Sequence, residues 1–288
     1  NTGSNAVAIG QNIQTASESI GIGKDTIVFG SKSVSIGTSN IMEGSESVAV
    51  GDSIAHVGYS AVSIGKGTST AANGTNVGTG SIVSAPAVSV GKGNVVDGSN
   101  AVAVGDSITH IGDNTIAIGS DIQNAGTSII AIGHKAGSHS DNAYDNIYIG
   151  SNAGLLDSGY KNLFIGSNTG SQNKGHQNVI LGFEAGVSNR FGNNNMFAGF
   201  NTGKKNLDGN ANTFLGFEAG VENEYGNNNT FLGFLAGSSN VASSEQNMLL
   251  WLKLEDDIKD CSRNNLSPSS NGDVLFRESN SEINVHVF

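Results

Sequence analysis

Short apolar triplets recur at a fixed spacing along the first half of the chain. Each triplet places a small residue between two β-branched residues and ends at a glycine, as in Val48, Ala49 and Val50 before Gly51. Alternation with a period of two is typical of a β-strand, and a glycine at every seventh position would destabilise a helix. The pattern therefore predicts short strands, each followed by a tight corner at a glycine with positive φ.

The glycines give the length of the repeat. They recur every seven residues in two series, and the apolar triplet precedes every other glycine, so the predicted unit has about fourteen residues and two limbs. The series are Gly23, Gly30, Gly37, Gly44, Gly51, Gly58 and Gly65, and then Gly91, Gly98, Gly105, Gly112, Gly119, Gly126 and Gly133. Such short strands need neighbours, so each coil is expected to bond to the coils above and below it. The predicted fold class is all-β, a parallel β-roll or β-solenoid.

The spacing loosens between Gly67 and Pro86. Because proline cannot donate a hydrogen bond to a strand ladder, an irregular coil or a protruding loop is expected in this stretch. In the regular coils on either side, Val and Ile are expected to form apolar ladders on one face of the strands, with Ala and Ser on the opposite face.

After Gly133 the repeat lengthens to sixteen or seventeen residues. It reads Asn, three mostly apolar residues, Gly, two variable residues, Ala or Thr, and Gly. The middle strand position is now large: Tyr148, Phe164, Ile180, Phe197, Phe214 and Phe231. A narrow coil has only one interior, so we expect the second apolar face to pack on other copies of the chain. This interpretation places Phe164, Phe197, Phe214 and Phe231 near the axis of a symmetric oligomer.

The asparagine before each of these strands is expected to form a ladder of side-chain amides that bond from coil to coil. Its members are Asn146, Asn162, Asn178, Asn195, Asn212 and Asn229. Together the two repeat families predict about sixteen coils. The expected domains are therefore a β-roll over residues 1–137 and a second β-solenoid over residues 138–240.

Residues 241–288 do not continue the repeat. Leu250 and Leu252 alternate with Trp251 and Lys253, which predicts a half-buried strand. This segment is too short for a stable core of its own. It is expected either to pack across chains or to begin a larger β-sandwich.

Two of the repeats resemble known families. The segments NAVAIGQN, SVAVGDS and AVAVGDS resemble the head repeats of trimeric autotransporter adhesins over roughly residues 5–137. The resemblance implies a left-handed parallel β-roll, three chains side by side, and binding to host matrix or cell surfaces. The NTFLGFEAG repeat is similar to repeats of bacterial surface proteins and phage tail fibres, and the segment MLLWLKLEDDIKDCSRNN is similar to the first strands of laminin-G or concanavalin-like lectin domains. The chain shows neither the coiled-coil stalk nor the membrane anchor of the adhesins, which adds weight to a virion fibre.

Charge and composition narrow the classes of partner. The chain has 25 Asp and Glu against 14 Lys and Arg, a net charge of -11, which disfavours nucleic acid and anionic membranes as partners. No apolar run approaches the roughly 20 residues that span a bilayer, so no direct membrane insertion is expected. The single cysteine, Cys261, excludes an intrachain disulfide.

Candidate chemistry is sparse. Asp52 and Asp106 recur in register and could bind a cation as a ladder, but Asp at a corner more often bonds to nearby backbone amides. His56 and His110 occupy equivalent coils and are expected to point outward as polar residues, and the acidic cluster at 255–260 is expected to be solvated. A polysaccharide-processing enzyme would need a pair of acidic residues in a long groove, and the repeats contain no such pair. We therefore expect no catalytic residues, no metal site and no cofactor.

The predicted function is that of a structural fibre or adhesin, extracellular or on a virion, that attaches to a cell or matrix surface. Its expected partners are two further copies of itself in a homotrimer and a surface glycan or protein receptor. The alternative is the shaft of a phage tail fibre or other virion fibre that carries a C-terminal, lectin-like receptor-binding domain. An ice-binding solenoid would need a regular array of Thr, and Thr is scattered here.

Overall fold

The computed structural model describes residues 3–140, 142–240, 250–253, 273–279 and 282–287 of the 288-residue chain. These residues form strands and turns and contain no helix. The described part accordingly has no helix that is long and apolar enough to cross a membrane. The chain divides into two units, Asn1–Lys135 and Ala136–Phe288.

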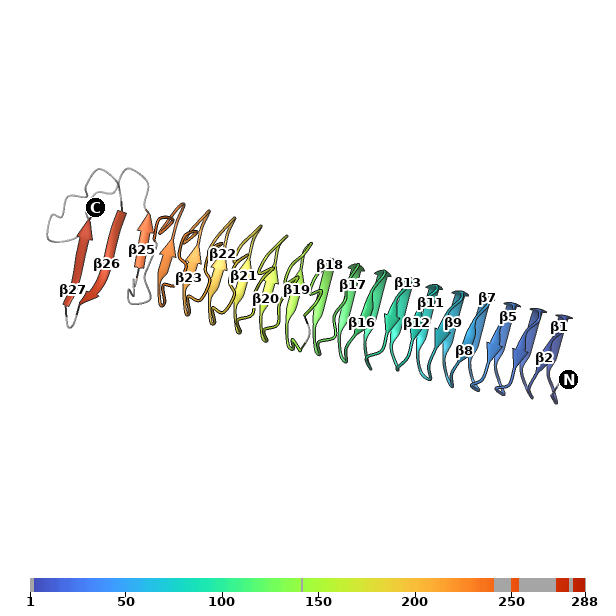
Figure 1. Ribbon diagram of the computed structural model, residues 1–288. Helices are drawn as coiled ribbons and strands as arrows, with labels where there is room; N and C mark the ends of the chain where they lie inside the picture. Colours follow the sequence, from blue (N-terminus) through green and yellow to red (C-terminus); the bar gives the residue numbers. More distant parts are fainter. Residues whose placement is uncertain (1–2, 141, 241–249, 254–272, 280–281, 288) are drawn as a thin grey trace. The chain divides into compact units, whose positions relative to one another are not determined.

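Ten five-residue strands of the first unit pair in parallel, each with the next along the chain (Figure 1). The register stays constant, so that Gly37 lies opposite Gly51 and Gly51 opposite Gly65. The strands are β1 (Val7–Gln11), β3 (Ile20–Lys24), β5 (Val34–Thr38), β7 (Val48–Asp52), β9 (Val62–Lys66), β11 (Thr75–Thr79), β13 (Val88–Lys92), β15 (Val102–Asp106), β17 (Ile116–Ser120) and β18 (Ile130–His134).

Eight shorter strands form a second parallel sheet on the other limb of the coils. They are β2 (Gln14–Thr15), β4 (Ile27–Val28), β6 (Ile41–Met42), β8 (Ala55–Val57), β10 (Ser69–Thr70), β12 (Ile82–Val83), β14 (Val95–Val96) and β16 (Thr109–Ile111). A coil therefore consists of a long strand, a corner, a short strand and a second corner. This arrangement confirms the predicted parallel β-solenoid with two limbs.

The recurring strand glycine lies inside the long strand and not at the corner. Gly37 has a φ of +133°, and a Cβ there would overlap the carbonyl oxygen of Gly51 in the next coil. The left-handed corner residue follows two positions later and is usually not glycine, as at Ser39 and Ser53 with φ of 55° and 56°. The spacing thus predicted the coil correctly but assigned the corner after the long strand to the wrong residue, whereas alternate glycines such as Gly30 and Gly44 do lie in bends between strands. The glycine is required because the stacked backbones approach so closely.

The expectation of an irregular coil or loop between Gly67 and Pro86 is wrong. Gly78 lies opposite both Gly65 and Gly91, so two coils of thirteen residues continue the sheet without a break. A corner can lose one residue while the strands keep their register. The glycines are then no longer seven or fourteen residues apart, so the repeat is not recognised from a fixed spacing. Pro86 lies at a bend, where its carbonyl accepts a hydrogen bond from the backbone N–H of Asn100 at 2.8 Å.

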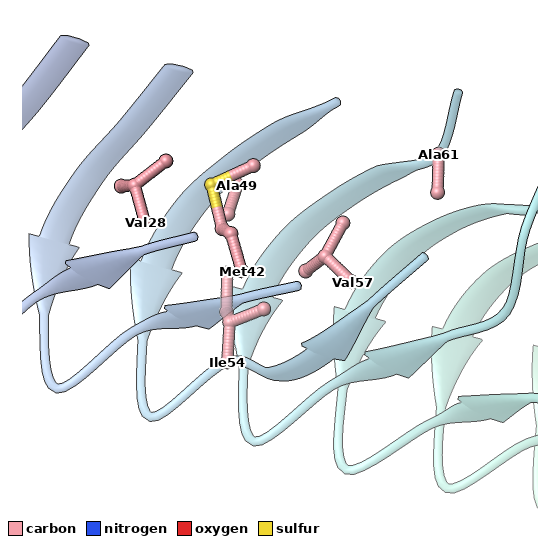
Figure 2. Packing of buried hydrophobic residues seen from close by; sticks show 6 residues of the cluster. All are labelled: Val28, Met42, Ala49, Ile54, Val57 and Ala61. Carbon is pink, nitrogen blue, oxygen red and sulfur yellow. The ribbon is translucent and has the colours of Figure 1, made fainter. Parts of the chain in front are cut away.

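The interior of the first unit is narrow. Small residues of the long strands, such as Ala49, face larger residues of the short strands, and Figure 2 shows Met42 reaching toward Ala49. Val28, Val57 and Ile54 belong to the same buried cluster. The Ala and Ser face predicted from the alternation is therefore the inside of the coil, and the Val and Ile ladders lie outside.

The second unit has only one short strand in each regular coil. The six strands are β19 (Ile147–Ile149), β20 (Leu163–Ile165), β21 (Val179–Leu181), β22 (Met196–Ala198), β23 (Thr213–Leu215) and β24 (Thr230–Leu232), and β25 (Leu250–Lys253) pairs with β24 in parallel. The antiparallel strands β26 (Asp273–Ser279) and β27 (Glu282–Val287) follow. With the ten coils of the first unit, the chain has about sixteen turns, as predicted. Most of the segment that resembles lectin-like domains lies outside the described residues.

The large residues at the middle of these strands fill the interior of a single chain. Tyr148, Phe164, Ile180, Phe197, Phe214 and Phe231 are all fully buried within their own coils. The expectation that the Phe rings lie near an axis between chains is therefore wrong. The Gly that ends each repeat makes room for the ring: Gly170 has a φ of +54°, and a Cβ there would lie 2.7 Å from the Phe164 ring.

Candidate interaction surfaces

Two rows of β-branched residues run along the outside of the long strands in the first unit. The side chains before and after the buried small residue point outward, so their apolar atoms stay partly in contact with solvent. Ile36 and Ile118 are each 39% exposed, and Ile64 and Val90 are similar. A continuous apolar face of this kind is unusual on a monomeric protein and marks a candidate interaction surface.

The second unit carries a different apolar feature, which we name the outer Phe ladder. It consists of the residues directly after the strand glycine in the last four regular coils: Phe183, Phe200, Phe217 and Phe234. These side chains are 41–57% exposed, in contrast to the fully buried Phe214 and Phe231 of the interior. The ladder lies beside a row of outward residues that precede the glycine, including Leu215 and Leu232.

The rings of the outer Phe ladder stack face to face. Successive ring centroids lie 5.5, 5.1 and 5.2 Å apart, with interplanar angles of 9°, 6° and 18°. The spacing between neighbouring rings is therefore close to the distance between neighbouring strands of a β-solenoid. The first two regular coils have Ser151 and Ser167 at this position, so the ladder covers only part of the unit.

A shorter aromatic stack occupies another corner of the second unit. Tyr144 and Tyr160 are parallel at 4.8 Å between ring centroids, and Tyr160 stacks on His176 at 3.9 Å. Later coils replace the ring with Asn193, whose side chain bonds to the His176 N–H at 2.7 Å. The corner changes from aromatic stacking to amide hydrogen bonds along the unit.

The predicted asparagine ladder lies inside the second unit, and each of its members is buried. From Asn146 to Asn212, the Oδ1 atom of each Asn accepts the backbone N–H of the corresponding Asn in the next coil, as in Asn178 N to Asn162 Oδ1 at 2.9 Å. Each Nδ2 atom from Asn146 to Asn212 donates to a glycine carbonyl of the next coil, as in Asn195 Nδ2 to Gly209 O at 2.8 Å. The members are Asn146, Asn162, Asn178, Asn195, Asn212 and Asn229. Most of these bonds therefore join a side chain to the backbone.

A second asparagine column, which the sequence interpretation missed, bonds amide to amide. Asn189 Nδ2 donates to Asn173 Oδ1 and Asn206 Nδ2 donates to Asn189 Oδ1, both at 2.6 Å. Asn223 and Asn240 continue the column at 3.1 and 3.0 Å. The signal was present in the sequence, because each of these Asn residues except the last precedes a predicted ladder Asn by five or six positions.

The second column begins at a buried carboxylate. Asp157 Oδ1 accepts Asn173 Nδ2 at 2.7 Å and the Gly159 N–H at 2.8 Å, and Tyr148 donates its hydroxyl to Asp157 Oδ2 at 2.7 Å. Burial raises the pKa of Asp157 to about 6, although these donors oppose the shift. Burial, with the Asp157 charge next in importance, raises the pKa of Tyr148 well above its ordinary value. The phenol therefore remains a proton donor to the carboxylate.

The other candidates for chemistry are dispersed. The Asp52 carboxylate accepts the Ser53 hydroxyl at 3.2 Å and lies 3.4 Å from Lys66 Nζ, which is an exposed ion pair at a corner. Within the described ranges, no group of three or more His, Cys, Asp or Glu side chains is placed to hold a metal ion. The side chains of His56 and His110 and the acidic cluster at 255–260 lie outside the described residues.

The comparisons with known proteins add no family. No protein-family model matches the chain, and no curated protein matches it.

Proposed function

We propose that this chain is a non-enzymatic structural segment of an extracellular or virion fibre, in which three copies pack side by side and display a surface for attachment. The observation that carries the proposal is the outward Val and Ile face of the first unit. Side chains such as Ile36 and Ile118 remain more than one-third exposed in the single chain. Covering that face with identical chains removes it from water.

Repetition supports an attachment role. Coils of nearly the same shape present similar outer surfaces again and again, and three chains multiply them further. Many weak contacts of this kind give high avidity to a surface glycan or protein receptor without one deep binding site. The proposed segment would act outside the cell, on a cell surface or on a virion.

The alternative is that the coils form the shaft of a phage tail fibre or other virion fibre and that a lectin-like domain containing residues 241–288 binds the receptor. Truncation after Asn240, followed by a cell-binding and glycan-binding assay, separates the two. Retained binding supports attachment by the repeats, and lost binding with unchanged oligomeric mass supports the shaft.

The assembly is tested by native mass measurement of the full chain. Ile36→Thr, Ile64→Thr and Val90→Thr together keep β-branched side chains but remove apolar surface, and we expect the trimer to dissociate to monomers. The matched control is Ile41→Thr with Ile82→Thr, because these exposed residues lie on the short strands of the other sheet. A wild-type chain that stays monomeric at every concentration would contradict the proposed fibre.

A further inference from the structure

We infer that the outer Phe ladder of the second unit is a seam at which a second copy of the chain docks side by side, parallel and in register. The inference rests on the proposed oligomeric fibre and adds the surface that the second unit contributes to it. The ladder is formed by Phe183, Phe200, Phe217 and Phe234, and no hydrogen bond of the fold requires an aromatic ring at these positions.

The stacking geometry defines what the ladder offers to a partner. The ring planes are nearly parallel and the centroids lie 5.1–5.5 Å apart, so each ring partly covers the face of its neighbour. A sugar ring stacks on the free face of an aromatic side chain, and inside the ladder each face is turned toward a neighbouring ring. A row of such rings fits instead against another apolar surface, where offset and edge-to-face contacts between aromatic rings are favourable.

The apolar surface extends beyond the rings. Leu215 is 46% exposed and Leu232 is 42% exposed, and each lies two positions before a ladder Phe. In the last two regular coils an exposed Leu therefore adds to the apolar surface of the ladder. Covering these Phe and Leu side chains removes apolar surface from water, which is favourable.

Polar contacts form a rim beside the ladder. Lys204 Nζ lies 2.6 Å from Glu184 Oε2, directly after Phe183 in the sequence. Asn201 Nδ2 donates to Glu218 Oε1 at 3.3 Å, beside Phe200 and Phe217. The acidic side chains next to the rings are therefore engaged within the chain. An apolar centre with a satisfied polar rim is the usual anatomy of a protein interface.

The period of the ladder selects the occupant. A partner that makes the same contact at every ring must repeat at the spacing of the coils, and a second copy of this unit does so. Orientation follows from the first two coils, which have Ser151 and Ser167 in place of Phe. A parallel copy in register sets four rings against four rings, whereas an antiparallel copy at the same level sets two of the rings against serines.

Ser151 and Ser167 show which substitution to use in the test. The fold accepts Ser at this position, so Phe200→Ser with Phe217→Ser should preserve the coils, as checked by circular dichroism. We expect the dissociation constant of the full-length oligomer, measured by sedimentation over a range of concentrations, to rise at least about a hundredfold. The control is Phe191→Ser, an exposed Phe of the same unit outside the ladder, which should leave the dissociation constant unchanged.

A cross-linking experiment tests the register. In a Cys261→Ser background, Ser151→Cys protein should cross-link to a second copy of itself through a short bismaleimide. In a parallel pair in register, position 151 of one copy lies beside position 151 of the other. A mixture of Ser151→Cys and Phe234→Cys proteins should give no cross-link between the two. Cross-linking only in the mixture would overturn the parallel register.

The outcomes separate this inference from the proposed function. If the wild type forms an oligomer and the double Phe variant dissociates at the same concentration as the wild type, the seam is wrong while the fibre stands. If the double variant keeps its mass but loses binding to cells or glycans, the ladder holds a ligand and not a second copy. A monomeric wild type removes both proposals.

Discussion

The two units close the same kind of coil around different interiors. In the first unit a second sheet closes the coil, and small residues such as Ala49 leave room for Met42 and Val57 from the opposite limb. In the second unit each regular coil has one strand, and a single large residue such as Phe214 fills the space. The size of the inward residue therefore follows from how many strands share the interior.

The residue directly before each long strand shows how the backbone hydrogen bonds are made in each unit. In the first unit this residue is Ser33 or Ser47 in some coils, and the Ser33 hydroxyl accepts the Ser47 N–H at 3.2 Å. In others it is Ala61, with no hydroxyl to accept a bond. In the second unit it is Asn in all six coils, because side-chain amides replace the hydrogen bonds that a second sheet would make. Buried amide ladders thus substitute for a missing strand.

The largest expected effect comes from emptying the interior of the second unit. Phe214→Ala removes a ring that stacks on Phe197 at 4.9 Å and on Phe231 at 4.6 Å. We expect a loss of about 3–5 kcal/mol in the free energy of unfolding, because the neighbouring coils cannot collapse into the cavity. Urea denaturation measures the total, and amide hydrogen exchange should accelerate in β22 to β24. Phe191→Ala is the control, and equal losses from both substitutions would contradict the assigned interior.

The buried Asp157 predicts a pH dependence that belongs to the second unit. Its pKa is raised from 3.8 to about 6, so the folded chain retains a proton that the unfolded chain releases between these values. The free energy of unfolding should therefore fall as the pH rises from about 4 to 6, and remain lower above that. The expected change is on the order of 3 kcal/mol, since one pKa unit corresponds to about 1.4 kcal/mol.

The variant Asp157→Asn tests this dependence, because an amide does not titrate and Asn occupies the same column in the later coils. Its free energy of unfolding, measured by urea denaturation from pH 4 to 7, should lose this slope. The exposed Asp208→Asn serves as the control and should keep it. A slope that survives Asp157→Asn would show that another group carries the dependence.

Sequence spacing predicted the coils because backbone contact forces glycine into one place, as at Gly37 against Gly51. It failed at Gly78, since a coil that loses one corner residue keeps its register but not its period. It also placed Phe164 on the wrong side. The middle strand residue faces the interior in both units, as Ala49 and Phe164 do, and only its size changes with the presence of a second sheet. The outer Phe ladder was visible as the Gly-Phe pair of the last four regular repeats, yet exposure could not be read from the letters.

The smallest expected effect comes from a buried hydroxyl group of the first unit. Ser47 Oγ donates to the Gly58 carbonyl at 2.6 Å and accepts the Ala61 N–H at 3.2 Å. Ser47→Ala should lower the free energy of unfolding by only about 1 kcal/mol, since Ala61 already occupies this position in the next coil and the two sheets hold the backbone. Urea denaturation measures this loss. If it matched the loss from Phe214→Ala, hydroxyl ladders would be as essential to the first unit as the ring interior is to the second, and the contrast between the two would fail.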